Sequence, residues 1–178
     1  MEPLCLPTDQ QVPIIFESVM RQVEFAMGYV GELLDATPRD RWFEIPEGMP
    51  CNIAWQVGHL TVAQYGLLLF RIRGRADGDM ELMPSKFRKM YGKQSVPSAD
   101  PAKQPTADEL LDRLKRVWQT ANDELPPTDL SVLSEPEGMP YAAYPTKLGA
   151  LMFSPLHLQI HAGQIGLIRR GLGLEPIR

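Results

Sequence analysis

Three histidines, the only ones in this chain of 178 residues, have a spacing that suits a metal site. His157 and His161 lie four residues apart, and His59 precedes them in a separate segment. On an α-helix, residues i and i+4 share one face, so both rings can reach one ion. An imidazole from a neighbouring helix would add a third ligand and leave a fourth position open, as in catalytic zinc sites. The alternative is that these histidines pack on amphipathic helices and are satisfied by hydrogen bonds.

A three-histidine site would support two kinds of chemistry. Neutral imidazoles suit transition metals, so we expect zinc or nickel, with iron or manganese as alternatives, rather than magnesium or calcium. A zinc ion lowers the pKa of a bound water to about 7, which would serve a hydrolase. The same ion can activate a thiol, because the thiolate and not the thiol is the nucleophile. The ligands themselves are compatible with both reactions.

The two reactions differ in whether they need a carboxylate near the metal. A hydrolase also needs a general base near the metal. Residues 53–76 and 146–174, which carry the histidines, contain no Asp or Glu. Glu17 and Glu24 border the apolar face of the first predicted helix, where charged side chains are normally solvated. This shortage favours thiol chemistry, and no residue is assigned as catalytic.

Three further residues could support the ligands. Trp55 precedes His59 by one helical turn, so it would either line the site or pack in the core. Gln64 and Gln164 lie on the histidine-bearing helices and could orient the imidazoles through their second nitrogens.

Four segments with apolar residues at three- and four-residue spacing predict helices, over residues 12–36, 52–73, 106–125 and 146–170. The third begins at a capping box, Thr106 to Glu109, and Gly171 is expected to end the fourth in a left-handed conformation. Pro155 either kinks the fourth helix or occupies the first turn of a shorter helix capped by Ser154. No stretch alternates like a β-strand, so we predict an all-α four-helix bundle as one domain over residues 1–178.

The connection between the second and third helices, Gly74 to Pro105, is longer than compact domains usually keep. It is either a crossover loop with a solvated basic edge or a lid over a pocket that prefers anionic substrates. Its basic and aromatic side chains are Arg75, Lys86, Phe87, Arg88, Lys89, Tyr91 and Lys93.

Composition excludes several classes of function. Hydrophobic residues make up 44% of the chain and charged residues 22%, as in ordinary globular proteins. The net charge of −4 argues against nucleic-acid binding. Residues 1–11 lack the apolar core of a signal peptide and no apolar run is long enough to span a membrane, so we expect a cytoplasmic protein. We expect Cys5 and Cys51 to be reduced, with Cys51 too far from His59 to be a ligand.

Two motifs resemble those of a known family. The segment Trp55–Leu60 resembles the W-x-x-x-H-L motif on the second helix of the DinB-like (YfiT-like) metalloenzymes. The segment His157–Ile165 resembles that family's H-x-x-x-H-x-G-Q-I motif on the fourth helix. Order and spacing agree over nearly the whole chain, although Ala162 stands where the family often has arginine.

The resemblance implies a four-helix bundle, often a homodimer, with a divalent metal held by His59, His157 and His161. Relatives include S-transferases and isomerases that use low-molecular-weight thiols. We therefore favour a metal-dependent enzyme that carries out thiol-dependent S-transfer on a small-molecule substrate. The alternatives are a metal-dependent hydrolase, a non-catalytic metal-binding or interaction module, and a bundle that binds an apolar ligand without metal.

Overall fold

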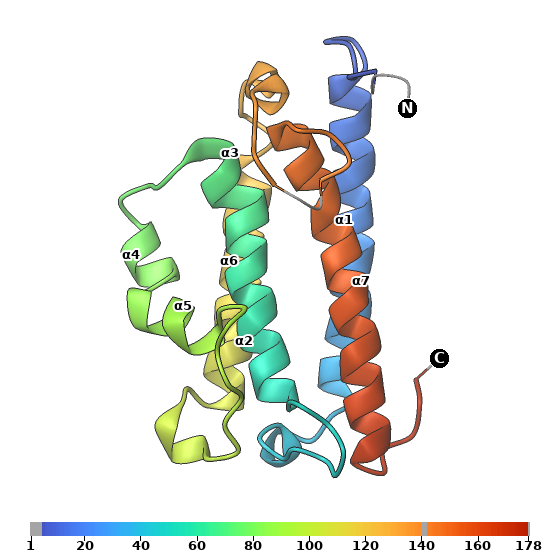
Figure 1. The fold of residues 1–178 in the computed structure, drawn as a ribbon, viewed down its shortest axis with the longest axis vertical. Coiled ribbons are helices and arrows are strands. Elements are labelled where there is room, and N and C mark those ends of the chain that lie inside the picture. The colour runs from blue at the N-terminus through green and yellow to red at the C-terminus, as the bar shows by residue number, and fades with distance from the viewer. Residues whose placement is uncertain (1–4, 140–141, 178) are drawn as a thin grey trace.

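The computed structural model describes residues 5–139 and 142–177, so the start of the N-terminal segment lies outside it. Four long helical stretches lie side by side, two running one way along the bundle and two the other (Figure 1). They are α1 (Val12–Asp35); α2 (Ile53–Gln64) continued by η2 (Tyr65–Phe70) and α3 (Arg71–Arg73); α6 (Ala107–Glu124); and α7 (Lys147–Gly171). The described residues form no strand beyond one isolated bridge. The prediction of an all-α bundle is confirmed.

The starts of the long helices follow the capping signals in the sequence. The side chain of Asn52 accepts a hydrogen bond from the backbone N–H of Trp55 at 2.9 Å and caps α2. The capping box of Thr106 and Glu109 is complete at the start of α6. These side chains satisfy backbone N–H groups that have no partner within the helix. Within α2–α3 the regular pattern is interrupted by η2, a π-helical segment that the sequence analysis did not anticipate.

The fourth helix is uninterrupted. Pro155 lies inside α7, which begins after Thr146, so the shorter helix capped by Ser154 is wrong. The expected left-handed residue is also wrong: Gly171 is helical, and Gly173 has the positive φ of 74°. The N–H of Gly173 donates to the carbonyl of Arg170 at 2.9 Å, the closing bond typical of a helix that ends in glycine. Gly171 must be small for another reason, because a Cβ there would lie 2.9 Å from Pro46.

The connection from residue 74 to residue 105 is partly helical. It contains α4 (Asp79–Leu82), α5 (Ser85–Tyr91) and the short 3-10 helix η3 (Pro101–Lys103). Because α2 and α6 run in the same direction, the chain has to return along the bundle between them, and this segment does so (Figure 1). Helix α5 packs on α2 and buries Phe87 and Tyr91, while Arg88 and Lys89 are exposed. The connection from residue 74 to residue 105 is therefore a crossover whose basic side chains Arg88 and Lys89 face solvent.

Two further features of the fold concern the cysteines and the length of the helices. Neither Cys5, which is exposed, nor Cys51, which is buried, forms a disulfide. None of the helices in the described part of the chain is both long enough and apolar enough to cross a membrane.

Candidate metal centre

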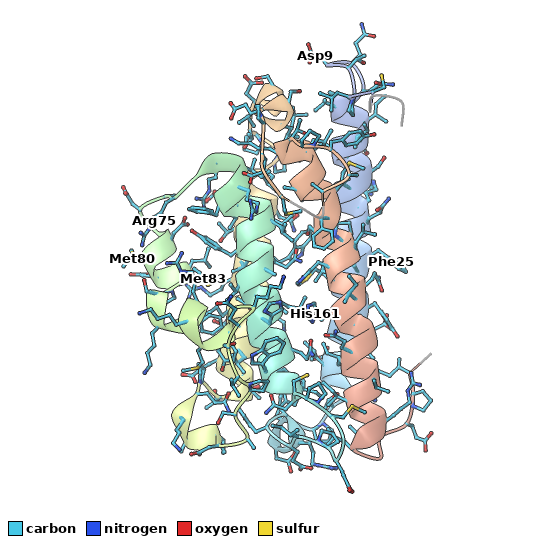
Figure 2. The ribbon with its side chains drawn as sticks, viewed as in Figure 1. Asp9, Phe25, Arg75, Met80, Met83 and His161 are labelled. Carbon is cyan, nitrogen blue, oxygen red and sulfur yellow. The ribbon has the colours of Figure 1, made fainter. Side chains whose placement is uncertain are left out.

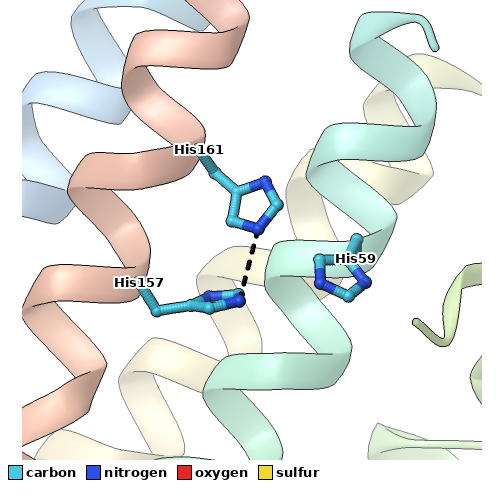
Figure 3. Close-up of side chains that lie close together, drawn as sticks. All are labelled: His59, His157 and His161. Atoms are coloured by element: carbon cyan, nitrogen blue, oxygen red, sulfur yellow. Dashed lines mark hydrogen bonds between the residues drawn. The ribbon is translucent and has the colours of Figure 1, made fainter. Parts of the chain in front are cut away.

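The three histidines converge between α2 and α7, two helices that pack against each other. His59 comes from α2, whereas His157 and His161 come from α7, and all three rings point into the same space (Figure 3). One ligand atom from each lies within 4.8 Å of the others. In the wider view His161 lies on the side of α7 that faces α2 (Figure 2). This is the one group of three or more His, Cys, Asp or Glu in the described residues that could hold a metal ion.

The ring nitrogens of His157 and His161 have the spacing of two ligands of a tetrahedral metal. Zinc–nitrogen bonds are about 2.0–2.1 Å long, so two ligands at the tetrahedral angle lie roughly 3.3 Å apart. The Nε2 atoms of His157 and His161 are separated by 3.3 Å. His59, with its ligand atom up to 4.8 Å from another, would have to approach by roughly 1.5 Å to complete that geometry.

Hydrogen bonds orient two of the three imidazoles. Nδ1 of His59 donates to the carbonyl of Tyr91 at 2.9 Å, and Nδ1 of His161 donates to Oε1 of Gln56. Both partners are oxygen acceptors, so the proton of each neutral ring is on Nδ1 and Nε2 carries the lone pair. In His161 that lone pair accepts a hydrogen bond from Nε2 of His157. Metal-binding histidines characteristically have such partners.

The third imidazole has no such partner. Among the described residues, Nδ1 of His157 is the one buried side-chain polar atom without a hydrogen bond. The ring of Phe153 lies beside it, with the ring centres 5.7 Å apart. An unsatisfied buried polar atom costs about 1–3 kcal/mol and calls for a functional explanation. No hydrogen bond at Nδ1 therefore fixes the tautomer of His157, in contrast to His59 and His161.

Burial keeps the three imidazoles neutral. Desolvation lowers the pKa of all three, to about 4 for His157 and about 3 for His161. Their mutual proximity lowers the pKa values of His157 and His161 further, and Lys93 acts in the same direction on His59. A neutral imidazole is the form that binds metal, so no proton has to be displaced near neutral pH.

Of the two glutamines predicted to support the ligands, Gln164 hydrogen-bonds to His161, whereas Gln64 pairs with Ser154. Ser154 Oγ donates to Oε1 of Gln64 at 2.6 Å, and Gln64 Nε2 donates to the Ser154 carbonyl at 3.4 Å. Gln164 is exposed, and its hydrogen bond is the smallest influence on the pKa of His161. Gln56 was not predicted as a site residue, because its only signal in the sequence is its place three residues before His59 on the same helix.

Trp55 and the crossover form a wall of the site. The indole ring of Trp55 stacks on His59, with centroids 4.8 Å apart and planes inclined by 6°. Its Nε1 donates to Oγ of Ser95 at 2.9 Å. Ser95 also lines a pocket of about 420 Å³ together with Arg88, Lys89 and Lys93. Because Tyr91 and Ser95 both belong to the crossover segment, that segment contributes to the position of His59.

Replacing Gly58 with alanine should loosen this wall. A Cβ at Gly58 would lie 2.3 Å from the ring of Tyr91, whose carbonyl holds His59. We expect overpacking to lower the free energy of unfolding by about 1–3 kcal/mol and to weaken metal binding. Urea unfolding and a zinc competition titration measure the two effects. Gly66→Ala is the control, since nothing lies within 4 Å of a Cβ there, and equal behaviour of both variants would contradict the prediction.

Comparison with models of protein families identifies the family of this chain. The model of the DinB superfamily matches residues 22–165, a range that contains all three histidines. A comparison with curated proteins found no significant match. The matched range covers well over half of the 178 residues. The chain belongs to the DinB superfamily.

Proposed function

We propose that this protein is a metal-dependent enzyme that transfers the sulfur of a low-molecular-weight thiol to a small electrophilic substrate. The observation that carries the proposal is the convergence of three neutral imidazoles within 4.8 Å, with no fourth protein ligand among the described residues. His59, His157 and His161 would hold a divalent ion, with zinc or nickel favoured by the donor set. When bound, the ion supplies Lewis acidity that lowers the pKa of a coordinated thiol.

The residues around the site would serve the thiol in defined ways. The stacked ring of Trp55 and the ring of Phe153 shield the flanks of His59 and His157 from water. His59 and His157 are only half-buried, which leaves the open position accessible to a small molecule. In the reaction the S–H bond breaks, its proton passes to solvent water, and sulfur forms a bond to the substrate carbon as the leaving group departs with its electron pair. No protein base is required.

The placement of the acidic residues supports thiol chemistry over hydrolysis. Glu17 and Glu24 are exposed on α1, and Glu17 pairs with Arg21 at 3.5 Å. Among the described residues, the charges that act on the three imidazoles are those of one another and of Lys93, and none is a carboxylate. A hydrolase would use a carboxylate in hydrogen-bond reach of the attacking water.

The test is the conjugation of a thiol such as cysteine or glutathione with a chromogenic aryl halide. Zinc-loaded protein should accelerate the reaction, and both the metal-free protein and His157→Ala should fall to the uncatalysed rate. Hydrolysis of a nitrophenyl ester, without thiol, is measured in parallel. Metal-dependent ester hydrolysis without thiol conjugation would contradict the proposal and identify a hydrolase. Metal binding with neither activity would favour a non-catalytic module.

A further inference from the structure

Gln56 links a buried cysteine to a metal ligand on another helix. The side chain of Gln56 is on α2, is 1% exposed, and accepts a hydrogen bond at Oε1 from Nδ1 of His161 on α7. At its other end, Nε2 of Gln56 donates to Sγ of Cys51 at 3.0 Å. Cys51 is also buried, at 8% exposed, and lies just before α2. The two residues and His161 thus form a continuous hydrogen-bonded chain.

The amide of Gln56 directs its donor end at the cysteine and its acceptor end at the histidine. An amide has a donor end and an acceptor end, and sulfur is a weak acceptor. With its donor end directed at Cys51, Gln56 presents its oxygen to His161. If the amide were rotated by half a turn, its N–H groups would face Nδ1 of His161 and favour the tautomer with the proton on Nε2, the nitrogen that the metal needs. The Cys51–Gln56 pair therefore keeps the proton of His161 on Nδ1 and leaves Nε2 for the metal.

This arrangement also sets the charge of the site. Metal-binding histidines often donate to a carboxylate, which partly compensates the charge of the ion. Here both oriented ligands donate to neutral groups, the amide of Gln56 and the carbonyl of Tyr91. Among the residues that the structure describes, the other charged side chain that acts on the ligands is Lys93, a cation. A divalent ion would keep its full positive charge, and its fourth ligand would preferably be an anion.

We propose that Gln56, oriented by Cys51, is a positioning residue that both fixes His161 and makes the open metal position selective for anionic ligands, of which a thiolate is the functional example. The inference rests on the proposed metal site. It predicts that the neutrality of Gln56, and not only its shape, determines what binds there.

The test uses cobalt as the metal, because its visible absorption reports the ligand geometry, and azide as the anionic probe. Gln56→Glu retains an acceptor for His161 and adds one negative charge near the ion. Cobalt affinity should be unchanged or higher, whereas azide affinity should fall by about tenfold. Gln56→Leu removes the acceptor, and cobalt affinity should fall by about 10–100-fold with an altered spectrum. A purely structural role would change both affinities in the same direction.

Further variants test the role of the thiol and control for packing. Cys51→Ser keeps an acceptor and should resemble the wild type, while Cys51→Ala frees the amide and should weaken cobalt binding several-fold. Gln64→Leu removes a buried amide from the same helix that pairs with Ser154, and it should leave the spectrum unchanged. Circular dichroism confirms that each variant is folded.

The outcomes separate this inference from the proposed function. If wild-type protein binds no cobalt, the metal site and the inference both fail. If cobalt binds but Gln56→Glu leaves azide affinity unchanged, or lowers both affinities as Gln56→Leu does, only the inference is overturned. A fall in azide affinity with cobalt affinity unchanged or higher in Gln56→Glu supports it.

Discussion

Replacing His161 with alanine should weaken zinc binding by more than about 100-fold. Loss of a hydrogen-bonded partner of a ligand typically costs 10–100-fold in metal affinity, and loss of the ligand itself should cost more. His161 is buried, and the hydrogen bond to Gln56 orients its ring. Its Nε2 lies 3.3 Å from Nε2 of His157. The dissociation constant is measured by competition with a chromophoric chelator. Gln159→Ala, an exposed change on the same helix, is the control.

The same substitution should remove the stabilisation that zinc provides. A ligand present at 100 times its dissociation constant raises the free energy of unfolding by about 2.7 kcal/mol, if it binds only the folded state. Wild-type protein and Gln159→Ala should show this increase in urea unfolding, and His161→Ala should not. An equal increase in all three would mean that zinc binds elsewhere, and the three-histidine centre would be wrong.

Replacing Asp79 with asparagine should lower the free energy of unfolding by about 3 kcal/mol. Asp79 is 3% exposed and accepts hydrogen bonds at 2.9 Å from two nitrogens of Arg73, and at 2.8 Å from the hydroxyl of Tyr65. Breaking a buried ion pair by removing one partner typically costs about 3–5 kcal/mol, because the other charge remains. Arg73 keeps a second partner in Glu124, which favours the lower end of that range.

The loss of stability caused by Asp79→Asn should depend on pH. Hydrogen bonds from Arg73, the largest influence, lower the pKa of Asp79 from 3.8 to about 2. Between these values the unfolded chain binds more protons than the folded chain, so the stabilisation is present above pH 3.8 and is lost as the pH falls to about 2. The difference between wild type and Asp79→Asn should therefore shrink over that range. Asp77→Asn, an exposed neighbour, should change stability by less than about 0.5 kcal/mol, and a comparable loss there would contradict the explanation.

Local features of the sequence were sufficient to predict the helices. Apolar spacing and capping residues such as Thr106 act within one or two turns, so the bounds of α1, α6 and α7 agree closely with the prediction. The errors arose where packing decides between two locally acceptable solutions. Gly171 and Gly173 both suit a helix end, but only Gly171 meets Pro46 from another segment. Pro155 fits inside α7 because the rest of that long helix is held by packing against α1 and α2.

In the candidate site, too, the contacts within one helix could be predicted from the sequence and the contacts between distant segments could not. The pairing of His157 with His161 follows from helical periodicity, but the partners of their nitrogens come from elsewhere. Gln56 reaches His161 across 105 residues of sequence, and the carbonyl of Tyr91 reaches His59 from a crossover that looked like a loop. Gln64 has the same side chain as Gln56 and lies on the same helix, yet it hydrogen-bonds to Ser154 instead of a histidine. The small-molecule substrate, the homodimer and the cytoplasmic location stay predictions.

The most direct test of the metal centre is the metal content per chain, measured by plasma mass spectrometry. The protein is purified without a histidine tag, incubated with zinc or nickel, and dialysed. A centre built from His59, His157 and His161 predicts close to one metal ion per chain. Protein that retains no metal after either incubation would contradict the metal centre and leave three packed histidines.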